Sequence, residues 1–141
     1  GGLIFLSSSD FYALGKVVKE PKRTLDVFPK PEGVSSVVLE SDEVTSVCPI
    51  TGQPDWETVT IEYVPERLCI ESKSLKLYFW SFRQEGVFCE ALAAQIAHDV
   101  GEACRPRHCK VTVQQKPRGG VTITASACYE KAENMTGEAK Q

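Results

Sequence analysis

Apolar and polar residues alternate in two parts of the chain, and this period of two most constrains how the chain can fold. Val59, Ile61 and Tyr63 alternate with polar residues, which predicts a half-buried β-strand. Residues 109–113 and 121–125 alternate in the same way on either side of a Pro-Arg-Gly-Gly turn, which predicts a β-hairpin. An antiparallel sheet is therefore the expected framework.

A helical repeat lies between these alternating segments. Within residues 85–100, apolar residues recur at steps of three and four. They are Val87, Phe88, Ala91, Leu92, Ile96 and Val100. Gly101 and the pair Arg105-Pro106 predict the end of this amphipathic helix.

Two further segments complete the predicted fold. Residues 68–80 are interpreted as a second strand, hairpinned to the strand that contains Val59, and residues 16–47 as an extended arm punctuated by proline and glycine. The order of two strands, a helical segment and two strands predicts an α+β fold, an antiparallel sheet with helix on one face. Because such a sheet leaves two edges unpaired, we expect several copies to pair into a ring or barrel.

Length and charge favour one domain without nucleic acid or membrane partners. With 141 residues and 42% hydrophobic content, we expect a single domain over residues 16–129, between an N-terminal segment (1–15) and a polar tail (130–141). A net charge of −3 provides no basic surface for nucleic acid. The longest apolar run near the start, Leu3 to Leu6, is far too short to span a membrane, so a cytoplasmic location is expected.

Metal and phosphate-binding motifs are not evident. The six cysteines are expected to be reduced, because the chain is not small and nothing else suggests secretion. There is no Cys-x-x-Cys pair and the only histidines are His98 and His108, so no metal site is predicted. The glycines fit neither the dinucleotide-binding fingerprint nor the phosphate loop, so a nicotinamide cofactor would have to bind another scaffold.

A thiol and a carboxylate stand at the two ends of one short loop, Cys48-Pro-Ile-Thr-Gly-Gln-Pro-Asp55. Two prolines stiffen the loop and a glycine allows it to bend, so both groups can face one pocket. Cys48 would then be a nucleophile and Asp55 the acid that neutralises the charge formed by its attack. The alternative is that Cys48 is a small buried residue and Asp55 a turn residue.

Two other groups of polar residues have both a functional and a structural interpretation. In residues 71–78, lysines and hydroxyls could bind phosphates, or they could keep an edge strand solvated. Glu90, early in the predicted helix, could accept hydrogen bonds from a guanine-like edge, or it could simply favour the helix N-terminus. Arg118 could contact an anion, or its turn could be purely structural.

These motifs together resemble, in order and spacing, the NADPH-dependent 7-cyano-7-deazaguanine reductases of queuosine biosynthesis, often called QueF. The resemblance covers roughly residues 14–127 and rests on Cys48-Pro-Ile-Thr-Gly-Gln-Pro-Asp55, Glu71-Ser-Lys-Ser-Leu-Lys-Leu-Tyr78, Phe88-Cys-Glu90 and Pro117-Arg-Gly-Gly120. It implies the tunnelling fold, in which subunits join into a barrel. A homo-oligomer of stacked rings, with active sites between neighbouring subunits, is expected from it.

The resemblance also implies a reaction. Cys48 would attack the nitrile carbon of 7-cyano-7-deazaguanine to give a covalent thioimide, and Asp55 would protonate the nitrile nitrogen. Two NADPH molecules would supply the four electrons that convert the nitrile to the amine. Glu90 would bind the base, with Glu71 and Ser72 contributing to the same pocket.

The remaining site residues follow from the same resemblance. Lys73, Ser74 and Lys76 would bind the cofactor, and Arg118 is a further candidate for its phosphates. Cys89 occupies the position before Glu90 where many relatives have a histidine, which places a second thiol beside the site. A protective disulfide between Cys89 and the catalytic cysteine is a hypothesis.

Two other functions remain possible from the sequence. One is a related amidinotransferase that uses the same cysteine and aspartate but modifies deazaguanine within tRNA, and which we expect to lack the lysine-bearing segment. The other is a ring-forming protein that binds a purine or pterin without catalysis. That second function would leave the combination of Cys48, Asp55 and the lysines unexplained.

Overall fold

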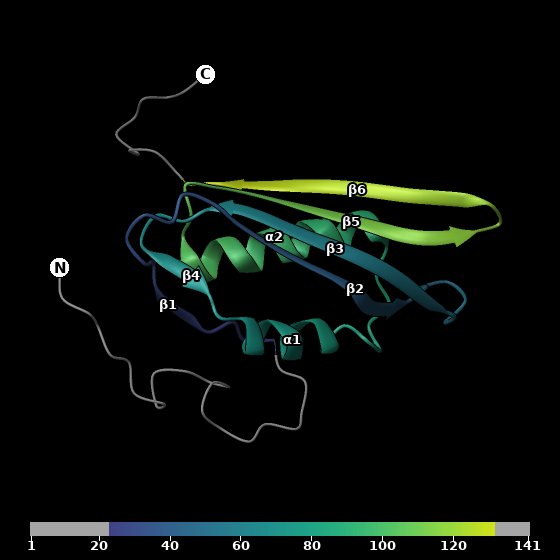
Figure 1. Ribbon diagram of the computed structural model, residues 1–141. Coiled ribbons are helices and arrows are strands. Elements are labelled where there is room, and N and C mark those ends of the chain that lie inside the picture. The colour runs from purple at the N-terminus through teal and green to yellow at the C-terminus, as the bar shows by residue number, and fades with distance from the viewer. Residues whose placement is uncertain (1–22, 132–141) are drawn as a thin grey trace, which may run out of the picture.

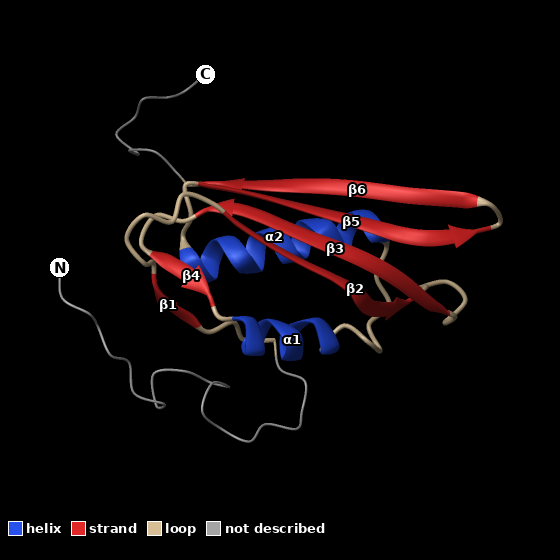
Figure 2. Ribbon diagram, in the orientation of Figure 1, coloured by secondary structure: helices blue, strands red, loops and turns tan. Residues whose placement is uncertain are grey.

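A four-stranded antiparallel sheet forms the centre of the structure, a computed structural model that describes residues 23–131. Its strands lie in the order β2-β3-β5-β6. They span Val37–Val47 (β2), Pro54–Val64 (β3), His108–Arg118 (β5) and Val121–Glu130 (β6). Helix α2 (Cys89–Cys104) lies across β5 and β6, and α1 (Ser72–Trp80) lies beside β2 (Figure 1). Both helices are on the same side of the sheet (Figure 2).

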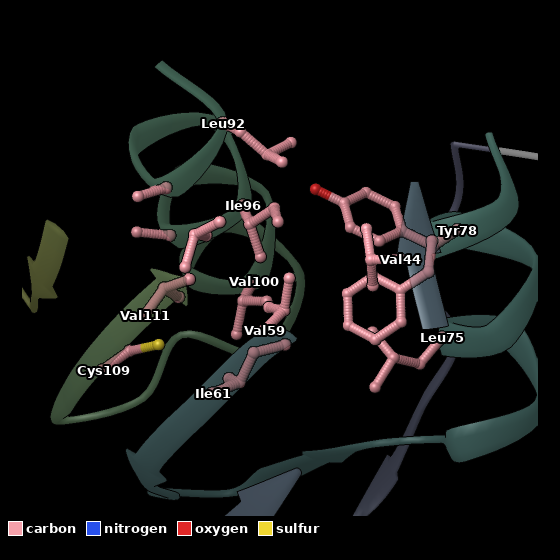
Figure 3. Packing of buried hydrophobic residues seen from close by; sticks show 14 of the residues in the cluster. Val44, Val59, Ile61, Leu75, Tyr78, Leu92, Ile96, Val100, Cys109 and Val111 are labelled. Carbon is pink, nitrogen blue, oxygen red and sulfur yellow. The ribbon is translucent and has the colours of Figure 1, made fainter. Parts of the chain in front are cut away.

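The hydrophobic core lies between the sheet and the two helices. β3 contributes Val59 and Ile61, which are both fully buried, and α2 contributes Leu92 and Ile96 (Figure 3). Tyr78 of α1 faces them, and its hydroxyl donates a 2.6 Å hydrogen bond to Asp99 of α2. The polar end of this buried ring is therefore satisfied, and the bond ties the two helices together.

The predicted helix and the predicted hairpin are both confirmed. The helix begins and ends four residues later than expected, and Arg105, in a left-handed conformation with φ of 48°, terminates it. In the hairpin, the two turn residues Gly119 and Gly120 have positive φ values of 62° and 80°, which suit a two-residue turn between twisted strands. The strand after the turn extends to Glu130, which had been predicted to belong to the polar tail.

The prediction of a long strand over residues 68–80 is wrong. Only β4 (Leu68–Ile70) is a strand, and it pairs with β1 (Val27–Pro29) instead of β3. From Ser72 the chain is helical, because the Glu71 side chain accepts hydrogen bonds from two free backbone N–H groups at the helix start. Apolar side chains also recur there with the helical period and are buried; they are Leu75, Tyr78, Phe79 and Phe82.

The prediction of an extended arm over residues 16–47 is also wrong where the structure describes it, since residues 37–47 form the long strand β2. A β-bulge lies between Ser41 and Val44. It moves the inward-facing side chains from odd positions, such as Leu39, to even ones, such as Val44 and Ser46. The alternation of buried and exposed residues therefore breaks in the middle of β2. For this reason the sequence pattern did not predict a strand here. Residues 1–22, including the expected segment 1–15, lie outside the described residues.

Within residues 23–131, no helix is both long enough and apolar enough to cross a membrane.

Gly101 provides a test of how β6 packs against α2. A Cβ atom at this position would lie 2.2 Å from the ring of Tyr129 on β6. We expect Gly101→Ala to lower the free energy of unfolding by about 1–3 kcal/mol, the usual cost of overpacking, despite the better helix propensity of alanine. Urea unfolding measures this, with His98→Ala on the exposed side of the helix as the control. An unchanged or higher midpoint for Gly101→Ala would contradict this packing.

Candidate active site

The loop between β2 and β3 holds Cys48 in a fixed position at one end of the sheet. The backbone N–H of Cys48 donates to the Gln53 carbonyl at 2.8 Å, and the N–H of Gly52 donates to the Cys48 carbonyl at 2.8 Å. Gly52 has a φ of 75°, a conformation that glycine adopts easily. The loop therefore closes on itself, and Asp55 follows it as the second residue of β3.

Arg118, at the end of β5, links the two ends of this loop. Its Nε lies 3.1 Å from Oδ1 of Asp55, an ion pair that lacks the angle of a hydrogen bond. Its Nη1 donates to the Gln53 side chain at 3.1 Å, and the guanidinium also donates a hydrogen bond to the Cys48 sulfur. Asp55 is 3% exposed, so Arg118 contacts a buried carboxylate and a partly exposed thiol at once.

The environment of Cys48 favours the thiolate. A hydrogen bond from the Thr51 hydroxyl, then the backbone N–H groups of Thr51 and Ile50, and then Arg118 lower the pKa of Cys48 to about 6. Each of these donors stabilises the negatively charged sulfur more than the neutral thiol. Cys48 is therefore mostly ionised at neutral pH, as a nucleophile requires.

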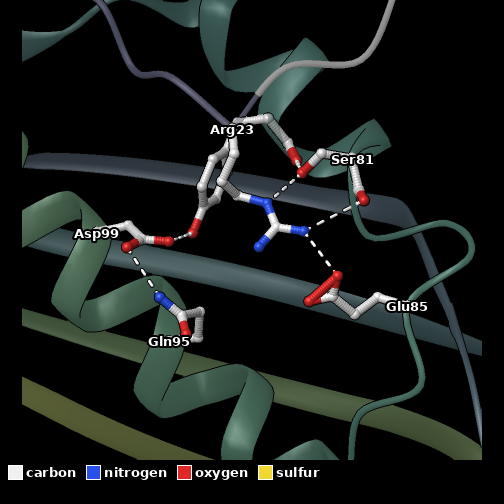
Figure 4. A network of polar contacts seen from close by, with 6 residues as sticks. Arg23, Ser81, Glu85, Gln95 and Asp99 are labelled. Atoms are coloured by element: carbon white, nitrogen blue, oxygen red, sulfur yellow. Dashed lines mark hydrogen bonds and ion pairs between the residues drawn. The ribbon is translucent and has the colours of Figure 1, made fainter.

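The start of α2 is joined to the same end of the sheet. Val47, the residue before Cys48, accepts a hydrogen bond from the N–H of Val87 at 3.2 Å and donates to the Glu85 carbonyl at 3.0 Å. Arg23 holds this connection from the other side, through a 3.0 Å ion pair with Glu85 and hydrogen bonds to Ser81 (Figure 4). These contacts bring the first turn of α2 to the site.

Cys89 and Glu90 occupy that first turn and point in different directions. Glu90 is exposed. Cys89 is 2% exposed, and its Sγ donates to the Val113 carbonyl at 3.5 Å. Burial, followed by the charges of Glu90, Glu57 and Asp55, raises the pKa of Cys89 to about 11. Cys89 is thus a neutral, inert thiol, and all six cysteines are free, so the proposed disulfide is not formed in this structure.

Glu57 is a site residue that the sequence interpretation missed. It is 1% exposed, and its Oε2 accepts hydrogen bonds from Ser46 at 2.8 Å and from Gln115 at 3.2 Å. Burial raises its pKa above the usual value for glutamate. The sequence pattern does predict its burial. Glu57 and Val59 are two residues apart in the predicted strand, so both side chains lie on the face that packs against the core.

The residues predicted from the segment 71–78 are not in contact with Cys48 in this subunit. Both oxygens of Glu71 cap α1, accepting from the backbone N–H groups of Lys73 and Ser74. Ser74 is fully buried, with its hydroxyl donating to the Glu71 carbonyl and accepting from the N–H of Asp26. Each Glu71 oxygen accepts one backbone hydrogen bond and Ser74 is buried, and the assignments of Glu71 to the base and of Ser74 to the cofactor stay predictions.

Ser72 and Lys76 line a groove of about 620 Å³ between α1 and the bulged part of β2. The β2 side of the groove carries three carboxylates, and it ends with Thr45, three residues before Cys48. The acidic residues are Glu40, Asp42 and Glu43. Arg118 does not line this groove. It therefore lies apart from the lysines with which it was predicted to bind the phosphates of the cofactor.

The acidity of Cys48 can be measured directly. We expect the rate at which iodoacetamide labels Cys48 to rise with pH around a midpoint near 6. Thr51→Ala should move this midpoint upward, because it removes the hydroxyl that stabilises the thiolate most, and Arg118→Ala should move it upward by less. Mass spectrometry of the Cys48 peptide gives the rate, and labelling of exposed Cys128 is the internal control. A midpoint above 8 in the unmodified chain would contradict this environment.

Comparisons with known proteins identify the family of this chain. The QueF family model, described as "QueF-like protein", matches residues 54–134. The NADPH-dependent 7-cyano-7-deazaguanine reductase of Syntrophus aciditrophicus (strain SB) is 48% identical over 120 residues, covering 84% of this chain and 85% of that protein. The enzyme of the same name from Halorhodospira halophila (strain DSM 244 / SL1) is 48% identical over 110 residues, covering 77% and 93%.

A solved structure has the same fold. The archaeosine synthase QueF-Like in the apo form superposes with a TM-score of 0.65 at 30% identity, covering 69% of this chain and 95% of that chain. The similarity supports the resemblance on which the tunnelling fold was expected. On the family match and on relatives of nearly half-identical sequence, the chain belongs to the QueF family.

Proposed function

We propose that this chain reduces the nitrile of 7-cyano-7-deazaguanine to the primary amine with NADPH, with Cys48 as nucleophile and Asp55 as proton donor. The observation that carries this proposal is the position of Arg118, in contact with both groups. A thiol with a pKa of about 6 beside a buried acid is the arrangement that addition to a nitrile needs. The same reaction is named for the relatives from Syntrophus and Halorhodospira.

The residues of the chain would act as follows. The Cys48 thiolate forms a bond to the nitrile carbon, and the electron pair displaced onto nitrogen takes a proton from Asp55, which gives a neutral thioimide. Arg118 stabilises the two anions that flank it, the thiolate before the attack and the Asp55 carboxylate after it. Glu90, exposed in the first turn of α2, is free to accept hydrogen bonds from the base.

The groove beside α1 fits part of a dinucleotide. Lys73 and Lys76 are one helical turn apart, so they project from the same side of α1, where Ser72 is also exposed. We assign the two lysines to the phosphates of NADPH, which when bound supplies the hydrides of the four-electron reduction, while Ser72 stays a predicted contributor to the base pocket. The carboxylates on β2 would repel the same phosphates, so the cofactor would lie against α1 and draw further contacts from a neighbouring subunit.

A ring of subunits would complete both sites. β2 and β6 are the edges of the sheet, and β6 carries few of the charges that usually protect an edge strand. Pairing β6 with β2 of the next copy would bring the groove beside α1 of that copy next to β6. The barrel, the absence of a nucleic acid partner, the cytoplasmic location and the domain limits 16–129 all stay predictions.

The similarity to an archaeosine synthase keeps one alternative open, the transfer reaction on deazaguanine-containing tRNA. This chain is 30% identical to that protein but 48% identical to the reductases, and it has the lysine-bearing segment on α1. Its net charge of −3 also disfavours a large polyanionic substrate. Modification of deazaguanine in tRNA, without oxidation of NADPH by the free base, would favour the alternative.

Turnover tests the assignment of the two reacting groups. With 7-cyano-7-deazaguanine present, the absorbance of NADPH should fall, two molecules being oxidised for each base reduced. We expect Cys48→Ala to abolish this loss, and Asp55→Asn to slow it by about 10²- to 10⁴-fold, the usual contribution of a general acid. The exposed cysteine variant Cys128→Ala is the matched control and should retain activity. Full activity of Cys48→Ala or Asp55→Asn would remove that residue from the mechanism.

Affinity for the base tests Glu90 separately. Glu90→Gln keeps the shape of the side chain but removes its charge, so binding should weaken by about 1.5–3 kcal/mol, the value of a hydrogen bond to a charged group. Calorimetry of base binding to Cys48→Ala, with and without Glu90→Gln, measures this without covalent reaction. His98→Ala on the same helix is the control. Equal affinities would exclude Glu90 from the base site.

A further inference from the structure

Among residues 23–131, Glu57 is the one buried carboxyl group beside the reacting pair that the proposed mechanism does not use. Its Oε2 accepts two hydrogen bonds, from Ser46 and Gln115, whereas its Oε1 is buried and has no partner among the described residues. A carboxylate buried in this way is costly, and a neutral carboxylic acid is much less so. With both donors directed at Oε2, the proton of the neutral acid belongs on Oε1.

Asp55 is the neighbour toward which that proton can move. Asp55 and Glu57 are alternate residues of β3, so they project from the same face of the sheet, with their Cα atoms about 6.6 Å apart. Both side chains are buried, and their negative charges raise each other's cost of ionisation. Arg118 contacts Asp55, whereas no cation contacts Glu57 among residues 23–131, so burial makes Glu57 the member that favours its protonated form.

We propose that Glu57 is the proton store of this active site, and that it supplies, through Asp55, each proton that reaches the nitrogen of the substrate. The proposal rests on the proposed nitrile reduction. In the first step the sulfur–carbon bond forms, one π bond of the nitrile breaks, and nitrogen takes a proton from Asp55 as Asp55 takes one from Glu57. Glu57 then regains a proton from solvent. No electrons are exchanged between the two carboxyl groups.

A store is needed because the reaction consumes several protons and Asp55 carries one. Reducing a nitrile to an amine with two hydrides takes up two further protons, both at the same nitrogen. Glu57 provides a second acid group, because it lies two residues from Asp55 on the same face of β3 and its burial favours the neutral form.

Among the residues that the structure describes, the immediate surroundings of Glu57 add no cation of their own. On β3 the titratable neighbour is Asp55, and from α2 it is Cys89, which is a neutral thiol. β2 and β5 contribute the uncharged donors Ser46 and Gln115. Beyond this shell lie Cys48, Glu90 and Arg118. Deprotonation of Glu57 therefore depends on transfer to Asp55 and on the pH.

The test is the rate at which the thioimide forms at Cys48 without NADPH, measured by intact mass across a pH series. In Glu57→Gln, adduct formation at neutral pH should be slowed by about a hundredfold, within the range for loss of a proton donor. The ratio of the variant rate to the wild-type rate should rise as the pH falls, because solvent then protonates Asp55 directly. A ratio that stays constant with pH, or a wild-type rate in Glu57→Gln, overturns the proposal.

Ser46→Ala is the matched control, since it disturbs the same hydrogen-bond network but keeps the carboxyl group. The hydroxyl of Ser46 lowers the pKa of Glu57, so its removal should let Glu57 keep its proton to higher pH. Adduct formation in Ser46→Ala should therefore hold up at alkaline pH, where Glu57→Gln is slowest. Equal losses in both variants would show that only packing matters and would overturn the proposal.

Thermal unfolding provides a readout that does not depend on the reaction. The pKa of Glu57 is raised in the folded chain above the value of 4.5 in water, so the neutral acid contributes stability below that value. This contribution is lost as the pH rises through the raised pKa, and Glu57→Gln removes the loss. The melting temperature of wild type should thus fall relative to that of Glu57→Gln as the pH rises. Absence of any adduct in wild type would instead overturn the proposed nitrile reduction, and the proton store with it.

Discussion

The contact of Arg118 with Asp55 and Cys48 is the interaction on which the rest of the site depends. Asp55 is buried, and an unpaired buried carboxylate would be costly, so the guanidinium at 3.1 Å makes its charge tolerable. The same guanidinium stabilises the thiolate. One cation thus joins a nucleophile and an acid that are seven residues apart in the sequence, and the chemistry follows from holding both in one place.

The fold provides this contact by bringing three connections to one end of the sheet. The β2–β3 loop supplies Cys48, the two-glycine turn after β5 allows Arg118 to reach it, and the segment held by Arg23 and Val47 brings the start of α2. The base-binding candidate, Glu90, arrives with that helix. By contrast, the groove beside α1 extends along β2 toward Cys48 but does not reach it within a single subunit. The proposed function therefore involves assembly of several subunits.

Local patterns in the sequence were enough to predict the helix, the second hairpin and the loop from Cys48 to Asp55. The α1 segment was not predicted as a helix because lysines and serines separate Leu75, Tyr78 and Phe79, whose helical period is short. β2 was not predicted as a strand because a bulge reverses the alternation of its buried and exposed residues. Local residue preferences do not reveal where a bulge occurs. The position of Arg118 beside Asp55 depends on the register in which β3 pairs with β5. This long-range register cannot be inferred from a single sequence. The burial of Glu57 could have been predicted, because the alternation of the strand places this carboxylate on the buried face.

The central claim is that the sulfur of Cys48 adds to a carbon–nitrogen triple bond while a neighbouring acid neutralises the nitrogen. The most direct measurement is the intact mass of the purified chain after incubation with 7-cyano-7-deazaguanine alone, followed by peptide mapping. The account predicts a mass increase equal to one base per chain, located on Cys48 and reversed on dilution or denaturation in excess thiol. A chain that stays unmodified under these conditions, or that carries the base on another residue, would contradict it.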